Sequence, residues 1–247
     1  MYSKIIKNKI IYIVLAVLTI CFVAFHSSQK GEKIVKGGDF YSKNDSAITK
    51  YAKLEIGKHK MYEKLGEDNM YPKFYATAKQ IELTGKKEAE AIKEAKTSII
   101  EEEAVKNFAK NNNIEMTDKE LSDKMKTQYN ELLAADNYSD FSGAYKKLNT
   151  TFEKEYWKNK EIHRVLFLRN KIYRSFIEKK IGKKLVNEQE DAALEKEWNK
   201  YFENMLKSFE NTKEYKTLSD KLSECEAYYN KYGTNIKSGE VKKLEYK

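Results

Sequence analysis

One segment decides the fold: residues 88–121, EAEAIKEAKTSIIEEEAVKNFAKNNNIEMTDKEL. Its apolar residues occur in pairs spaced five and four residues apart: Ile99–Ile100, Ala104–Val105 and Phe108–Ala109. This spacing places them on one side of a helix about six turns long, which therefore has a face for the core. Asn111 to Asn113 predict the end of that helix, because Asn competes with the helical backbone for hydrogen bonds and tolerates a left-handed C-cap. Thr117 and Glu120 have the spacing of a capping box, so a second helix is expected from Asp118.

The order and spacing of these residues resemble the N-terminal chaperone domain of the SurA and PrsA foldases. That domain has two apolar pairs, an Ala, a Gly-Ile, an apolar residue, Ser/Thr before Asp/Glu, and a Glu before another apolar residue. Asn113 stands where the family usually has Gly, and Asn is the next-best residue for a positive φ. The resemblance covers Pro72 to Lys179. It implies a mainly α-helical fold, a SurA N-terminal-like helical chaperone domain closed by a C-terminal helix.

In these foldases a parvulin domain, the peptidyl-prolyl isomerase, follows at the position of Ile181. Here, residues 187–210 instead carry an apolar stripe at helical spacing: Leu194, Trp198, Tyr201, Phe202, Met205 and Phe209. This stripe resembles the closing helix of the family's chaperone domain, so no parvulin domain is expected. A peptidyl-prolyl isomerase is therefore the weakest functional alternative, and a non-enzymatic protein is expected.

Composition and charge favour helices and argue against nucleic acid as a partner. Of the 247 residues, 34% are charged and 40% hydrophobic, with a single Pro and a net charge of +9. The basic residues are almost all Lys and alternate with Glu and Asp, which indicates a solvated surface of mixed charge. Recognition of nucleic acid usually depends on Arg, and the chain has only Arg164, Arg169 and Arg174. A Lys-rich exterior favours anionic surfaces such as lipid headgroups instead.

Near the N-terminus, Ile10 to Gln29 contain no charged residue and follow three Lys residues. Such a segment is either a cleaved signal peptide or a membrane-spanning signal anchor whose positive end stays in the cytoplasm. The C-terminal end of the segment lacks the pair of small residues that cleavage by signal peptidase requires, so we expect a retained anchor. Lipidation of Cys21 is a further alternative, but Ile20 stands where a lipobox needs Gly, Ala or Ser. The expected location is the cell membrane, with a single pass and the bulk of the chain extracytoplasmic.

The predicted organisation has five parts. These are a cytoplasmic stub and transmembrane signal anchor at 1–29, a linker at 30–45, the SurA N-terminal-like domain at 46–210, an additional amphipathic helix at 211–232 and a flexible tail at 233–247. Residues 46–66 fit either a helix or a short strand around Leu54 to Ile56. Pro72 suits the first turn of a helix, and Phe152 to Lys179 are expected to form one long helix.

The additional helix carries a seam of apolar residues that repeat every four and then three positions: Leu218, Leu222, Cys225, Tyr229 and Tyr232. Such a coiled-coil-like seam predicts a possible homodimer through Leu218, Leu222, Cys225 and Tyr229. The alternative is that Cys225 is a lone buried thiol within one chain. Cys21 is expected to lie in the bilayer and Cys225 outside it, so no disulfide within the chain is predicted.

The sequence shows no catalytic, cofactor-binding or metal-binding constellation. His26, His59 and His163 are far apart along the chain, which suggests neither a metal site nor a His-based dyad, and His163 is expected to be a hydrogen-bonded structural residue. Glu101 to Glu103 are expected to form a solvated acidic face. No phosphate-binding loop, nucleophile elbow or paired Cys motif is present.

The candidate contacts for a client or partner are aromatic residues: Tyr156, Trp157, Trp198, Tyr201, Tyr229 and Tyr232. For Tyr156 and Trp157 the alternative is a place in the core. The sequence and its resemblance predict a membrane-anchored, extracytoplasmic chaperone-like protein that binds unfolded or partly folded secreted polypeptides without catalysis or cofactor. The alternative is an envelope assembly or scaffold protein that holds one folded partner through its helical surfaces.

Overall fold

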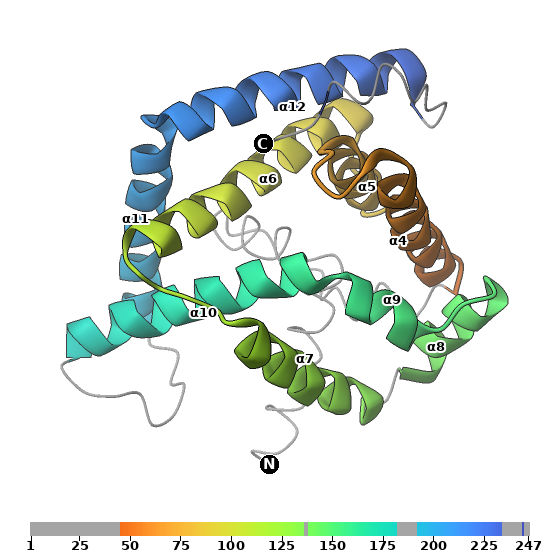
Figure 1. Cartoon of the computed structure of the whole chain (residues 1–247), viewed down its shortest axis with the longest axis horizontal. Coiled ribbons are helices and arrows are strands. Elements are labelled where there is room, and N and C mark those ends of the chain that lie inside the picture. Colours follow the sequence, from red (N-terminus) through yellow and green to blue (C-terminus); the bar gives the residue numbers. More distant parts are fainter. Residues whose placement is uncertain (1–44, 136–137, 182–191, 234–243, 245–247) are drawn as a thin grey trace.

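The computed structural model describes residues 45–135, 138–181, 192–233 and 244 (Figure 1). Within these residues the chain forms nine helices and no strand, which confirms the predicted mainly helical class. The helices are α4 (Asp45–Leu65), α5 (Tyr71–Glu82), α6 (Glu88–Asn111), α7 (Asp118–Leu133), α8 (Tyr138–Lys147), α9 (Phe152–Lys158), α10 (Lys160–Ile181), α11 (Ala192–Glu210) and α12 (Lys213–Tyr232).

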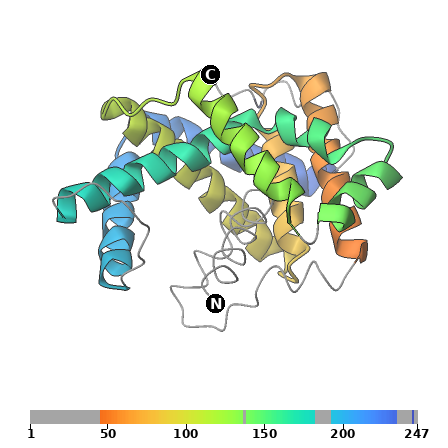
Figure 2. The same cartoon turned by 90° about the horizontal axis from the view of Figure 1, so that it is seen from below.

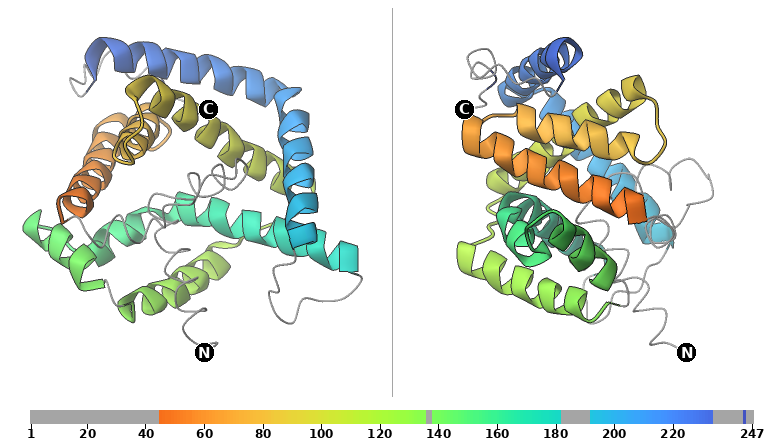
Figure 3. Two further views of the ribbon diagram at one scale, coloured as in Figure 1. Left: turned by 180° about the vertical axis from the view of Figure 1, so that it is seen from behind. Right: turned by 90° about the vertical axis from the view of Figure 1, so that its right-hand side faces the viewer.

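The predicted central helix is α6, which contacts α5, α10, α11 and α12. Contact on several sides requires small residues that let neighbouring helices approach, and α6 buries four Ala side chains along its length. Figure 2 shows α7 lying across α10, and these two helices are in contact. Figure 3 shows α11 and α12 meeting at a corner and running along two sides of the molecule.

The ends of the helices follow the local signals of the sequence. Asn113 has φ of 55°, so this Asn takes the left-handed conformation after α6. The Thr117 side chain accepts a hydrogen bond from the Glu120 N–H at 3.2 Å and caps α7. Pro72 lies in the first turn of α5, and Gly233, with φ of 52°, follows α12. These four predictions are confirmed.

Two predictions about helix continuity need correction or completion. The expected single helix from Phe152 to Lys179 is two helices, because the chain breaks at Asn159 between α9 and α10. The ambiguous segment around Leu54 to Ile56 is helical and lies within α4. The break at Asn159 matters most, because it changes the direction of the chain beside α4.

The apolar seam of α12 packs inside the molecule. Leu218, Leu222 and Cys225 are fully buried, and Tyr229 is almost so. Helix α12 contacts α5, α6 and α11, and the Tyr229 ring meets the Phe74 ring of α5 edge to face at 6.1 Å. The side chains that the sequence predicted to join two copies therefore pack within one chain.

The two ends of the chain differ in what the structure describes. After Gly233, only Leu244 is described; it is 4% exposed, and its carbonyl accepts a hydrogen bond from the Met70 N–H at 3.2 Å. The expected tail is thus held against the helical body at this residue. The predicted anchor, Ile10 to Gln29, and residues 30–44 of the linker lie outside the described residues. None of the described helices combines the length and the apolar character needed to cross a membrane.

Candidate functional site

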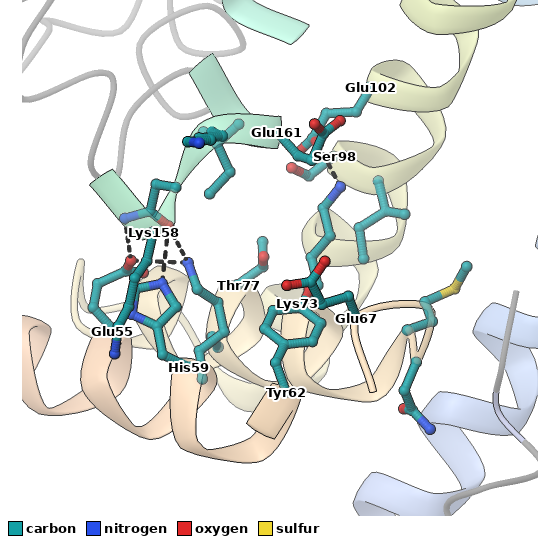
Figure 4. A pocket seen from close by; sticks show the side chains of 18 of the residues that line it. Glu55, His59, Tyr62, Glu67, Lys73, Thr77, Ser98, Glu102, Lys158 and Glu161 are labelled. Carbon is teal, nitrogen blue, oxygen red and sulfur yellow. Dashed lines mark hydrogen bonds and ion pairs between the residues drawn. The ribbon is translucent and has the colours of Figure 1, made fainter. Parts of the chain in front are cut away.

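A cavity of about 770 Å³ lies between α4, α5, α6 and the junction of α9 with α10 (Figure 4). Helices α4, α5 and α6 present lining residues at positions that share one helical face: Glu55, His59 and Tyr62 on α4, Lys73, Thr77 and Gln80 on α5, and Ser98 and Glu102 on α6. Trp157 to Ile162 close the remaining side. Cavities of this size, roughly 300–1,000 Å³, are typical of sites for small molecules and cofactors.

Asn159 organises a buried polar cluster at one end of the cavity, which consists of Glu55, Lys58, His59, Gln80, Glu155 and Asn159. The Asn159 amide oxygen accepts a hydrogen bond from Lys58 Nζ at 2.9 Å and lies 3.2 Å from His59 Nε2. Its amide nitrogen donates to Glu55 Oε2 at 3.2 Å and to the Glu155 carbonyl at 3.1 Å. The break between α9 and α10 therefore places one amide group where it joins both helices to α4.

Glu55 is the carboxylate that ties α4 to α5. It accepts hydrogen bonds from Lys58 Nζ at 2.8 Å and from Gln80 Nε2 at 2.5 Å. Burial raises the pKa of Glu55, but the charge and hydrogen bond of Lys58, the charge of His59 and the hydrogen bond of Gln80 outweigh it. The pKa of Glu55 is therefore held below its ordinary value, and the side chain is ionised at neutral pH.

The polar cluster also contains a His–carboxylate pair that connects α4 to α9. His59 Nδ1 lies 2.6 Å from Glu155 Oε2, and Thr150 donates to the other oxygen of Glu155 at 2.9 Å. Burial raises the pKa of Glu155, but the hydrogen bonds from His59 and Thr150 outweigh it and hold the pKa below its ordinary value. Both nitrogens of His59 thus face oxygen atoms of the cluster, an arrangement that fixes the ring rather than presenting it to a reacting hydroxyl or thiol.

The opposite wall of the cavity carries one ion pair between α5 and α6 and a second pair within α6. Lys73 pairs with Glu102, and Lys106 pairs with Glu103 at 2.7 Å. Burial lowers the pKa of Lys73, but the charges of Glu102, Glu103 and Glu161 outweigh it, so the pKa lies above its ordinary value. Figure 4 shows Lys73 reaching from α5 toward Glu102, with Glu161 of α10 nearby. Ionic groups of both signs therefore line this wall at neutral pH.

No group of three or more His, Cys, Asp or Glu side chains in the described ranges is placed to hold a metal ion. The charges of the polar cluster are satisfied by other side chains of the cluster. What the cavity offers to a ligand is hydroxyl groups, carboxylates and the edges of Trp157 and the apolar lining residues. Such a surface suits reversible binding.

In comparisons with family models, curated proteins and solved structures, no match to this chain is found.

Of the six aromatic residues predicted as contacts, only Trp157 lines the cavity. Tyr156, Trp198 and Tyr229 are buried in the core and present little surface to a client in this state. Tyr201 and Tyr232 are half-buried and lie outside the cavity lining. Tyr156 is a core residue, which was the alternative to its prediction as a contact.

The polar cluster itself was missed by sequence reasoning. His59 and Glu155 are 96 residues apart, and the sequence gives no sign that these two positions meet. The sequence does contain one sign of the polar cluster, which is the spacing of polar residues in α4. Glu55, His59 and Tyr62 share one face of a helix that otherwise buries apolar residues such as Tyr51 and Ala52. A buried polar face of that kind requires polar partners from other elements.

Two further expectations were wrong. Glu101, predicted to be solvated, is buried; burial raises its pKa to about 7, although the charge of Arg169 opposes the shift. His163, predicted to be hydrogen-bonded, is fully buried, and neither ring nitrogen has a hydrogen-bond partner within the described part of the chain. Its ring instead packs against Tyr156 and Phe167, with centroid distances of 4.6 and 6.1 Å.

Proposed function

We propose that this protein is a membrane-anchored, extracytoplasmic, chaperone-like protein that binds segments of unfolded or partly folded secreted polypeptides in the cavity, without catalysis. The observation that carries the proposal is the cavity, whose walls come from helices distant in the sequence and combine fixed polar groups with apolar edges. An unfolded segment needs both kinds of surface, because its backbone amides require hydrogen bonds while its apolar side chains gain from burial. The resemblance of residues 72–179 to foldase chaperone domains supports the same function.

The distribution of apolar surface favours the cavity over an open face as the binding site. Among the described residues, Leu133 is the only large hydrophobic side chain that is strongly exposed, at 45%. One side chain does not make an apolar patch that could hold many clients. The cavity, in contrast, is lined by Met70, Ile81, Ile99 and Trp157 together with its charged residues.

The proposed location rests on the uncharged segment from Ile10 to Gln29 and on its poor match to a cleavage site. An anchor of this kind would hold the helical domain outside the cytoplasm, where newly secreted chains emerge. Binding of such chains should be weak, because ordering of the client consumes much of the free energy gained by burial.

The proposal is tested with the full chain in lipid nanodiscs. We expect suppression of the aggregation of a chemically denatured test protein at near-stoichiometric ratios and without nucleotide, measured by light scattering. Trp157→Ala should weaken this suppression because Trp157 lines the cavity, whereas Tyr232→Ala, at a half-buried aromatic position outside the lining, should not. Equal loss in both variants, or acceleration of prolyl isomerisation in a proline peptide, would contradict the proposal.

A scaffold protein that holds one folded partner is the second candidate. It is favoured by the scarcity of exposed apolar side chains, since a folded partner can be held through polar and charged contacts. Crosslinking in intact membranes separates the two functions. Many crosslinked secreted chains support the chaperone, and a single folded partner combined with no effect on aggregation supports the scaffold.

A further inference from the structure

We infer that the cavity selects extended polypeptide segments that carry Lys or Arg, and that it binds their backbone through the hydroxyl groups of Tyr62, Thr77 and Ser98. This inference rests on the proposed function and specifies which clients the cavity accepts.

Three hydroxyl groups line the cavity and have no hydrogen-bond partner among the described residues. Tyr62, Thr77 and Ser98 come from α4, α5 and α6, and none of them hydrogen-bonds to another described residue. Figure 4 shows the three residues around the open centre of the cavity. A hydroxyl group both donates and accepts, so three of them on different helices can meet the alternating N–H and C=O groups of an extended backbone.

Ser98 forms no side-chain hydrogen bond with another described residue. Only 3% of the residue is exposed, and it belongs to the lining of the cavity. A helical Ser or Thr commonly satisfies its hydroxyl by donating to the carbonyl four residues earlier, as the neighbouring Thr97 does toward Lys93 at 3.1 Å. Ser98 does not form this bond, and it lies on the cavity wall beside Glu102. Its hydroxyl is therefore available to a group that enters the cavity.

The charge of the lining indicates which side chains such a segment carries. The cavity is lined by seven carboxylates and five Lys side chains, whereas the whole chain has a net charge of +9. Glu67 and Asp68, exposed at the turn between α4 and α5, form no ion pair with another described residue. The cavity is thus an acidic site in a basic protein, and cationic side chains of a ligand would reach these two carboxylates at its edge.

The carboxylates also act on the hydroxyl of Tyr62, which comes from α4. Burial and the charges of Glu102, Glu55 and Glu67 all raise the pKa of Tyr62. The Tyr62 hydroxyl therefore remains protonated throughout the physiological range and can donate to a backbone carbonyl. These three carboxylates, on α6, on α4 and in the turn after α4, are negative, which favours a ligand that brings positive charge.

Fluorescence anisotropy with three labelled peptides tests the selection. The peptides have equal length and identical apolar residues, with Lys, Gln or Glu at the variable positions, and the full chain is held in zwitterionic nanodiscs with empty nanodiscs as the blank. We expect the Lys peptide to bind about tenfold more tightly than the Glu peptide, with the difference shrinking as salt increases. The net charge of the protein alone predicts the opposite order, so preference for the Glu peptide overturns the inference.

Variants separate the two parts of the inference. Ser98→Ala and Thr77→Val should weaken the binding of all three peptides by a similar factor, about fivefold, because these variants remove contacts to the peptide backbone. The double variant Glu67→Gln, Asp68→Asn should weaken the binding of the Lys peptide alone. Matched controls outside the lining are Ser142→Ala on α8, Thr127→Val on α7 and Asp123→Asn on α7, which should leave binding unchanged.

The outcomes distinguish this inference from the proposed function. If all three peptides bind equally and Trp157→Ala weakens them, the cavity binds polypeptides without charge selection and the inference is overturned alone. If the charge variants leave the Lys peptide unchanged, it is likewise overturned. If no peptide binds and aggregation is not suppressed, the proposed function itself fails.

Discussion

His163 shows how a single buried group makes stability depend on pH. Burial, with a smaller effect of the Lys58 charge, lowers the pKa of His163 to about 4. The unfolded chain therefore takes up a proton at a higher pH than the folded chain does. The contribution of His163 to stability is complete above the ordinary pKa of about 6.5 and is lost as the pH falls toward 4, a difference of about 3 kcal/mol.

We expect His163→Phe to abolish this loss, because Phe fits between the rings of Tyr156 and Phe167 and cannot be protonated. The measurement is the free energy of urea unfolding at pH 7 and pH 4.5 for the parent and the variant. The variant should lose less stability on acidification than the parent does. Equal losses in the two proteins would show that His163 is accessible to protons in the folded state.

Glu101 has the opposite pH dependence. Its pKa is raised to about 7, chiefly by burial, so the folded chain keeps this proton after the unfolded chain has released it. Its contribution makes the folded state less stable as the pH rises from about 4.5 to 7, by up to about 3 kcal/mol, and is constant above that. Glu101→Gln should therefore unfold at higher urea concentration than the parent at pH 8 and close to it at pH 4.5. A gain of equal size at both values would point to a cause other than ionisation.

The burial of Glu101 could have been predicted from its spacing. The residue precedes Ala104 by three positions and Val105 by four, which places it on the core face of α6. Glu101 to Glu103 occupy successive positions of α6 and therefore point in different directions. The sequence did not reveal that Glu101 is covered by other helices, because its burial depends on how α10 and α11 pack against α6.

At the break between α9 and α10, the Asn159 side chain connects these two helices to α4. The Asn159 side chain contacts Lys58, Glu55 and His59, and each of these is buried. Asn159→Ala would leave the charged Lys58 and Glu55 with fewer hydrogen bonds in a buried site. We expect the free energy of unfolding to fall by about 3 kcal/mol, measured by urea denaturation at pH 7.

The matched control for this prediction is Asn170→Ala on α10, where the side chain is exposed. Its effect should stay within about 0.5 kcal/mol. A comparable loss in both variants would mean that the polar cluster contributes no more than helix propensity does.

Helix ends were predictable where the signal is local, and the break between α9 and α10 was not. Thr117, Asn113 and Gly233 act on their own backbone, so their roles can be inferred from a few neighbouring residues. Asn159 follows a good helical pattern, and its helix ends because its amide is engaged by α4, about 100 residues earlier in the chain. A contact of that range decides the local structure but leaves no local trace in the sequence.

At the scale of the whole molecule, the packing of α12 predicts a chain that does not form disulfide-linked dimers. Burial and the charge of Glu224 raise the pKa of Cys225 to about 12, so almost no reactive thiolate exists at neutral pH. We expect maleimide to label Cys225 only after denaturation, and non-reducing electrophoresis of membranes to show a monomer. A dimer band that disappears in Cys225→Ser would require α12 to leave α5, α6 and α11.

The mainly helical class and most helices could be predicted because apolar periodicity and capping are local properties. The cavity could not, because its polar cluster brings together α4 and α9 across roughly 100 residues of sequence. The aromatic residues chosen as contacts illustrate the same limit. Tyr156 and Trp157 are neighbours on one helix turn, yet the first is buried in the core and the second lines the cavity.

The uncharged segment from Ile10 to Gln29 leads to a prediction about how the whole molecule is held. We expect the protein to stay in the membrane fraction after a high-salt wash and to be released by detergent, because a retained apolar segment of this length can span the bilayer. Residues 30–44 can reach at most about 50 Å when fully extended, so such an anchor would hold the cavity close to the membrane surface. The measurement is immunoblotting of washed membranes, with N-terminal sequencing of the mature chain. A soluble form that begins near Ser27 would show cleavage, and a lipidated N-terminal Cys21 would replace the helical anchor with a lipid one.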